Sequence, residues 1–278
     1  MARKFRFVLM LKDICFPTAE IDLKQIMISG GLRKAIEEYV KSGKIIPLTA
    51  IQIFNRGKLR GIPDSVRILR SLNVFDVELY FITPIGLIWE EEPLVPYKHC
   101  LDELSIDDIT KFFQDSKTDE AIYDVLESQP DFLYLYVNTK LIKLLDLVSY
   151  IPKDTVCFLV ADIGISVKRE NIKPLYPSPA ILSIFKKYKL KISSDNFPSM
   201  MLWYISLVFS RLSREMKPES FLNYLLNIKN NPSEFLNMIT SPELLYYVEK
   251  ARDQSLLRFF DRERKKRGEK DAQKRDNY

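Results

Sequence analysis

The fold is decided by two short apolar runs, Phe132-Leu-Tyr-Leu-Tyr-Val137 and Thr155-Val-Cys-Phe-Leu-Val-Ala161. Both runs are continuously apolar, a pattern typical of strands that are covered on both faces of a sheet. Between them, apolar residues recur at helical spacing, at Leu141, Leu144, Leu145 and Val148. A strand, a helix and a second strand within about 30 residues make one right-handed crossover unit. This stretch therefore predicts a sheet with at least one parallel pair of strands.

The segments before this unit predict further strands and helices. Residues 3–11 form an apolar run that suits a central or flanked strand, and residues 73–92 suit two strands joined at Pro84-Ile-Gly86. Polar residues alternate in the first of these two strands, so we expect it at an edge of the sheet. A β-favouring run at 48–54 predicts another strand. Helices are predicted at 21–40 with a break at Ser29-Gly-Gly31, and at 64–72, 102–114 and 118–127.

Beyond residue 163 the composition changes from mixed to mostly helical. Prolines at 174, 177 and 179 mark residues 163–179 as a loop and as the best candidate for a domain boundary. The predicted fold class is α/β, a mixed sheet with at least one parallel crossover, followed by a mostly α-helical C-terminal part. The predicted domains are an α/β domain at 1–173, a helical domain at 180–260 and a charged, frayed or solvent-exposed helical tail at 261–278.

The composition is that of an ordinary soluble globular protein, with 46% apolar and 28% charged residues. The net charge is +5, from 42 basic and 37 acidic residues. Residues 261–278 contain eight Lys or Arg and five Asp or Glu, a net charge of +3, which leaves +2 for the other 260 residues. A nearly neutral body excludes the strongly basic domain that dominates phosphate-driven binding.

Cysteine spacing and hydropathy predict the cellular compartment of the chain. Cys15, Cys100 and Cys157 lie far apart with no CxxC pair, so we expect neither a disulfide framework nor a cysteine zinc site. A reducing compartment, the cytoplasm, is the simplest expectation, and Arg264-Lys-Lys-Arg267 is a short match to a nuclear-import signal. No apolar stretch reaches the roughly 20 residues of a membrane span, and the first one is too short for a signal peptide, so we expect no membrane segment.

Few motifs point to catalysis. His99 is the only histidine, it has no G-x-S-x-G partner motif, and neither a dinucleotide-binding nor a P-loop glycine pattern occurs. A single Asp-x-Gly after a strand, at Asp162 and Gly164, resembles the first phosphate loop of actin-like and sugar-kinase folds, but no second phosphate loop accompanies it. The sequence therefore assigns no catalytic residue, no metal ligand and no cofactor.

A metal-dependent nuclease is the alternative from another class. Pro130-Asp131 before a strand fits the start of a PD-(D/E)xK pattern, with Asp146 as the partner acid and Asp162 or Glu127 as a further ligand. The pattern requires a lysine where the chain has Val148. It also requires residues 141–149 to be a strand, whereas their apolar spacing is helical. A helix at residues 141–149 would remove the nuclease geometry, and a strand there, paired with residues 132–137, would restore it.

Two basic groups are candidates for contact with RNA or DNA. The first group lies in a segment with several glycines and consists of Arg56, Lys58, Arg60, Arg67 and Arg70. The second group lies in the tail and consists of Arg264, Lys265, Lys266 and Arg267. Nearby glycines would let backbone amides approach a phosphate. The alternative is a solvated charged surface, and in the tail interspersed acids favour pairing along a helix.

These observations favour a non-enzymatic intracellular interaction protein. We expect it to bind a protein partner through its helical C-terminal half, with auxiliary contact to nucleic acid by the two basic groups. A nuclease centred on Asp131 and Asp146 is the first alternative. A structural or accessory subunit of a larger assembly, for example a viral one, is the second. A site assembled from scattered carboxylates and lysines would leave no signature in the sequence.

Overall fold

The computed structural model describes residues 4–25, 41, 48–187 and 192–232. Its centre is a six-stranded sheet with the spatial order β10-β9-β8-β1-β4-β5. The strands of this sheet are β1 (Phe5–Lys12), β4 (Phe75–Thr83), β5 (Gly86–Trp89), β8 (Phe132–Tyr136), β9 (Val156–Val160) and β10 (Ile172–Leu175). Two short pairs lie outside it: β2 (Ile21–Asp22) with β7 (Tyr97–Lys98), and β3 (Leu48–Thr49) with β6 (Pro93–Leu94).

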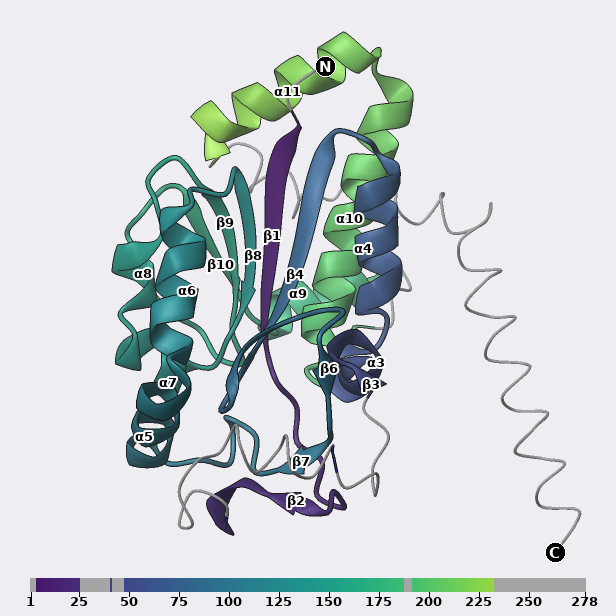
Figure 1. The fold of residues 1–278 in the computed structure, drawn as a ribbon. Helices are drawn as coiled ribbons and strands as arrows, with labels where there is room; N and C mark the ends of the chain where they lie inside the picture. The colour runs from purple at the N-terminus through teal and green to yellow at the C-terminus, as the bar shows by residue number, and fades with distance from the viewer. Residues whose placement is uncertain (1–3, 26–40, 42–47, 188–191, 233–278) are drawn as a thin grey trace, which may run out of the picture.

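Helices cover the sheet on both sides. The helices of the structure are α3 (Ala50–Phe54), η1 (Gly57–Leu59), α4 (Ile62–Ser71), α5 (Ile106–Ser116), α6 (Thr118–Glu127), α7 (Thr139–Leu144), α8 (Leu147–Tyr150), α9 (Pro179–Lys187), α10 (Phe197–Glu215) and α11 (Pro218–Asn230). Figure 1 shows α4 and α10 side by side on one side of the sheet, and α6 and α8 on the other. The predicted fold class, α/β with a parallel crossover and a mostly helical C-terminal part, is confirmed.

The strand order creates one point at which the direction of winding reverses. β1 is parallel to both of its neighbours, β4 and β8, and β9 and β10 continue the parallel arrangement beyond β8. The five parallel strands are β1, β4, β8, β9 and β10. If these five are counted 1 to 5 along the chain, their order in the sheet is 2-1-3-4-5. The sixth strand, β5, runs antiparallel to β4. This is a doubly wound order, in which consecutive connections pass to opposite faces on either side of the first strand. The reversal lies between β1 and β8.

Aromatic rings fasten α10 to the middle of the sheet. The Phe209 ring lies 6.2 Å from Phe7 of β1, 5.2 Å from Phe75 of β4 and 5.8 Å from Phe132 of β8, measured between ring centroids. Most residues of α10 are buried, so its apolar residues extend around the whole helix rather than along one stripe. The helical C-terminal part and the sheet thus share one hydrophobic core, while the predicted division at residues 173–180 stays a prediction.

Two predicted segments differ from the structure. Residues 48–54 form a two-residue strand and then α3, because Gln52 accepts a hydrogen bond at 3.1 Å from the backbone N–H of Thr49 and so begins a helix. Residues 163–179, predicted as a loop, contain β10. Pro174 is compatible with this strand because β10 is at the edge of the sheet, where a missing backbone N–H is tolerated.

Other predictions hold with adjustments. The central crossover is helical, as its spacing predicts, but consists of two short helices, α7 and α8. The predicted hairpin is β4 and β5, and β5 rather than β4 lies at the edge. Of the predicted helix at 21–40, residues 21–22 form the strand β2 instead and residues 23–25 are helical, whereas residues 26–40, like all of the tail at 261–278, lie outside the described residues. No helix in the described part of the chain is long and apolar enough to cross a membrane.

Replacing Phe209 by alanine tests whether α10 belongs to the same core as the sheet. The change removes a buried ring that contacts three strands, so the free energy of unfolding should fall by about 3–5 kcal/mol. Ile106→Ala is the control, because Ile106 is 52% exposed and its loss should cost less than about 1 kcal/mol. Denaturant titration measures both values. Equal, small losses would mean that α10 packs on the sheet only weakly.

Candidate functional site

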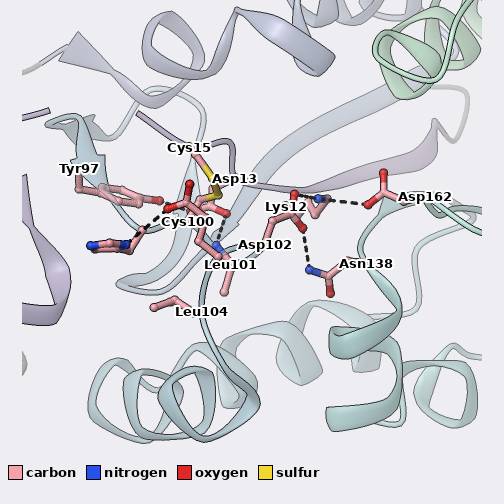
Figure 2. Close-up of a disulfide and its surroundings, with 12 residues drawn as sticks. Lys12, Asp13, Cys15, Tyr97, Cys100, Leu101, Asp102, Leu104, Asn138 and Asp162 are labelled. Atoms are coloured by element: carbon pink, nitrogen blue, oxygen red, sulfur yellow. Dashed lines mark hydrogen bonds and ion pairs between the residues drawn. A yellow bond between two sulfur atoms is a disulfide. The ribbon is translucent and has the colours of Figure 1, made fainter. Parts of the chain in front are cut away.

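Three parallel strands end at the same edge of the sheet, and a polar side chain stands at or just beyond the end of each. Lys12 is the last residue of β1, Asn138 follows β8 and Asp162 follows β9. Asp102, from the loop between β7 and α5, and Lys58 of η1 join them. Figure 2 shows Lys12, Asp102, Asn138 and Asp162 together. We call these five residues the carboxyl-edge cluster.

Lys12 is the buried centre of this cluster. Its side chain is only 1% exposed, because β1 has strands on both sides and helices above and below. The amine donates a hydrogen bond to Oδ2 of Asp102 and lies 3.4 Å from Oδ2 of Asp162. It also lies 5.0 Å from the centroid of the Tyr136 ring, within the range of a cation–π contact. An unpaired buried ammonium would cost several kcal/mol, so the carboxylates make this position tolerable.

Asp102 is held from two directions. Its Oδ1 accepts a hydrogen bond from Nδ2 of Asn138 at 2.9 Å, and the backbone oxygen of Asp102 accepts one from the Lys140 amine at 3.1 Å. Burial raises the pKa of Asp102, but the charge and hydrogen bond of Lys12, aided by Asn138, outweigh it, so the pKa lies below its ordinary value. Asp102 therefore stays ionised at neutral pH.

Asn138 fixes the cluster to the backbone. Its Oδ1 accepts a hydrogen bond from the N–H of Leu141 at 3.0 Å and so caps α7. Because the amide nitrogen of the same side chain donates to Asp102, both ends of the Asn138 amide are engaged. The side chain therefore ties the end of β8 to the loop that carries Asp102.

Asp162 and Lys58 form the solvent-facing rim of the cluster. Lys58 Nζ lies 3.2 Å from Oδ1 of Asp162, and the same oxygen accepts a hydrogen bond from the Tyr136 hydroxyl at 3.3 Å. The side chains of Asp162 and Lys58 are 35% and 36% exposed, and that of Asp102 is 39% exposed. A buried amine thus lies beside partly exposed carboxylates and one partly exposed amine, and the exposed part of these side chains is in contact with solvent.

Asp13, next to Lys12, is fully buried and has a separate set of partners. Its Oδ2 accepts a hydrogen bond from the Tyr97 hydroxyl at 2.6 Å and its Oδ1 accepts one from the N–H of Leu101 at 3.0 Å. Burial raises the pKa of Asp13 to about 7, although these hydrogen bonds and the charge of Lys12 oppose the rise. Asp13 thereby attaches the segment before Asp102 to the end of β1.

The structure corrects the expectation that the cysteines are unpaired. Cys15 and Cys100, 85 residues apart in the chain, form a disulfide, and their Cα atoms are 4.8 Å apart. Figure 2 shows the disulfide beside Asp13 and Asp102. Sequence spacing could not predict this pair, because the two cysteines meet only when the loop after β7 folds over the end of β1. Cys157 is free and buried in β9.

The cluster offers hydrogen-bond acceptors and positive charge, but the described residues offer no metal site. No group of three or more His, Cys, Asp and Glu in the described part of the chain is arranged to hold a metal ion. Asp102 and Asp162 can accept hydrogen bonds from hydroxyl or amino groups, and Lys58 can donate to an anion. The lowered pKa of Asp102 makes it a poor proton donor at neutral pH.

The predicted nucleic-acid contacts of the basic segment have different partners in the structure. Lys58 belongs to the carboxyl-edge cluster, whereas Arg70 pairs with Glu90 and Arg67 pairs with Asp64. The Arg56 guanidinium lies 4.2 Å from the centroid of the Phe16 ring. Their role, and that of Arg60, stays a prediction. Residues 264–267 lie outside the described residues, so the tail contact and the nuclear-import match stay predictions as well.

The groups required for the nuclease alternative lie apart. Asp131 precedes β8, at the opposite edge of the sheet from Asp162, and accepts hydrogen bonds from the N–H of Arg6 and from Lys229. Residues 139–144 and 147–150 are helical, so Asp146 does not lie on a strand beside β8. His99, the only histidine, lies 3.4 Å from Asp22 and from Glu103. Asp131 and Asp146 are therefore not neighbours on adjacent strands.

Comparison of the chain with protein-family models, with curated proteins and with solved structures finds no significant match. Function must therefore be inferred from the geometry of the carboxyl edge. The sequence marks Lys58 as basic and Asp162 as part of an Asp-x-Gly, but its motifs do not single out Lys12, Asp102 or Asn138. The available signal was that a polar side chain stands at or just beyond the end of each of three buried strands.

Asp13 should make the stability of the chain depend on pH. The pKa of Asp13 in the folded chain is raised to about 7 from an ordinary 3.8. Its contribution to the free energy of unfolding is therefore fully present below about pH 4 and is lost as the pH rises to about 7. Asp13→Asn removes this loss. The difference in unfolding free energy between variant and wild type should therefore grow by roughly 4 kcal/mol between pH 4 and pH 8, at about 1.4 kcal/mol per pKa unit. Denaturant titrations across this pH range measure it.

Asp107→Asn is the control for this experiment, because Asp107 is an exposed acid of α5. Its difference from wild type should stay nearly constant over the same range. A constant difference for Asp13→Asn as well would contradict the buried, desolvated environment assigned to Asp13.

Proposed function

We propose that the chain is a binding protein whose ligand is a small polar molecule taken up at the carboxyl edge of the sheet. One observation carries the proposal: the ion-paired carboxyl-edge cluster coincides with the point between β1 and β8 at which the strand order reverses. In open α/β sheets, ligands bind outside the carboxyl ends of the strands at this switch point. The topology and the placement of charged groups support the same location independently.

The chemistry of the rim supports a ligand with both hydroxyl groups and an anionic group. Asp102 and Asp162 are acceptors that suit hydroxyl or amino groups, and Lys58 suits a phosphate or carboxylate. A nucleotide or a sugar phosphate carries both kinds of group. Binding is favoured over general-acid catalysis by Asp102, because Lys12 keeps this carboxylate ionised, so that it accepts hydrogen bonds and has no proton to donate at neutral pH.

The proposal includes part of the nucleic-acid prediction from the sequence. The sequence predicts Lys58 as a phosphate contact of a basic segment, and its pairing with Asp162 supports a role at the ligand site instead. A protein partner on the helical C-terminal half remains a separate prediction, and residues beyond 232 lie outside the described part of the chain.

Calorimetric titration with adenosine monophosphate, ribose 5-phosphate, inorganic phosphate and a short single-stranded RNA tests the proposal. We expect at least one phosphate-bearing probe with hydroxyl groups to bind. Lys58→Met and Asp162→Asn should each weaken it at least about tenfold, since a hydrogen bond to a charged group contributes about 1.5–3 kcal/mol. Both variants leave the buried pair of Lys12 and Asp102 intact.

Arg67→Met is the matched control, because Arg67 is a basic residue of the same segment whose side chain is 69% exposed and lies outside the cluster. Its loss should leave the affinity unchanged. If Arg67→Met weakens binding as much as Lys58→Met, and the affinity falls steeply with salt, the contact is a diffuse one to phosphate. That result, or a lack of binding by every probe, would contradict the proposed ligand site.

A further inference from the structure

We propose that the Cys15–Cys100 disulfide is a redox-sensitive clamp that holds Asp102 against Lys12, so that its reduction by a dithiol loosens the carboxyl-edge cluster. The clamp regulates the site proposed above, and its effect on ligand affinity rests on that proposed function. The loosening itself does not.

The position of the disulfide along the chain is the main support for the clamp. It joins two segments that also meet through an ion pair: Lys12 lies three residues before Cys15, and Asp102 lies two residues after Cys100. The clamp therefore lies within a few residues of both partners. A change in the distance between Cys15 and Cys100 would be transmitted to the distance between the Lys12 amine and the Asp102 carboxylate.

The segment that carries Asp102 has little other secondary structure to hold it. It follows β7, a two-residue strand whose partner in the sheet, β2, also has two residues. Its remaining attachments are the buried side chains of Leu101 and Leu104 and a set of polar contacts. Leu101 donates to Asp13, and Asp102 accepts from Lys12 and from Asn138. The contacts with Asp13 and Lys12 require the segment to lie close to the end of β1, which is the condition that the disulfide enforces covalently.

The two cysteine residues differ in exposure, and this difference favours one order of reaction. Cys15 is partly exposed, whereas Cys100 is fully buried. A thiolate of the dithiol attacks Sγ of Cys15, the S–S bond breaks, and Cys100 leaves as a thiolate that takes up a proton. The second thiol of the reductant then attacks the mixed disulfide and releases Cys15 as a thiol. The protein gains two electrons and two protons, and the reductant becomes a disulfide.

Cys157 gives an internal control within the same chain. It is fully buried in β9, and burial raises the pKa of its thiol well above the ordinary value. A thiol in this environment reacts only when the sheet opens. Its protection therefore reports on the sheet, whereas the reactivity of Cys15 and Cys100 reports on the clamp.

Alkylation after treatment of the folded chain with dithiothreitol tests the first step. Mass spectrometry should find two alkylated cysteines, 15 and 100, while Cys157 stays unmodified until denaturant is added. If all three cysteines react together, the disulfide is reduced only when the whole chain unfolds. That result would overturn the proposal.

Hydrogen exchange of the oxidised and reduced full chain tests the second step. Amides at 99–104 should exchange at least tenfold faster after reduction, and amides of β9 should not change. The double variant Cys15→Ser/Cys100→Ser should match the reduced wild type, and Cys157→Ala should keep the response to dithiothreitol. Should the double variant not fold, reduced wild type alone decides. Equal exchange in the two redox states would contradict the clamp.

Affinity for the phosphate-bearing probe, measured in both redox states, separates this inference from the proposed function. Faster exchange at 99–104 without binding of any probe would support the clamp and reject the proposed ligand. Binding with equal affinity, together with equal exchange in both states, would support the ligand site and reject the clamp. Weaker binding after reduction, with faster exchange, is the result that we expect.

Discussion

The buried ammonium group of Lys12 is the constraint on which the carboxyl edge depends. The strand that carries it is central and apolar on both faces, so the charge at its end has almost no access to water. A charge in such a place must be paired, because an isolated one costs several kcal/mol. Two carboxylates from different loops, Asp102 and Asp162, meet this requirement. Both loops reach the end of β1, and Asn138, which caps α7, also donates a hydrogen bond to Asp102.

The two edges of the sheet satisfy their polar groups in different ways. At the amino edge, Asp131 accepts from the N–H of Arg6 and from Lys229 of α11, so the carboxylate joins the sheet to the C-terminal helices. At the carboxyl edge, partly exposed carboxylates face solvent above a buried amine. Between the edges, the phenylalanine rings around Phe209 fill the apolar layer. The carboxyl edge, where partly exposed carboxylates lie at the reversal of strand order, is therefore where we propose that the ligand binds.

The sequence predicts the parts of this structure that depend on local pattern. Continuous apolar runs predict β1, β8 and β9 because strands inside a parallel sheet need no polar face. The prediction of a strand at residues 48–54 is wrong for most of the segment. Its alternating β-branched residues suit a strand, but the helix start at Thr49 and Gln52 makes residues 50–54 helical. The carboxyl-edge cluster and the disulfide could not be predicted, since Lys12, Cys15, Cys100 and Asp102 meet only through strand order and loop path. A lysine that follows an apolar strand gives no sign of its partners.

The free energy of coupling between Lys12 and Asp102 tests most directly whether their pairing organises the carboxyl edge. A double-mutant cycle of Lys12→Met, Asp102→Asn and the combined variant, each measured by denaturant titration, isolates the interaction between the two side chains. If Asp102 is the main partner of a buried Lys12, removing both residues should cost less than the sum of the single losses by at least about 1.5 kcal/mol. Losses that add within about 0.5 kcal/mol would mean that the two side chains act independently, and would contradict the central role of their pairing.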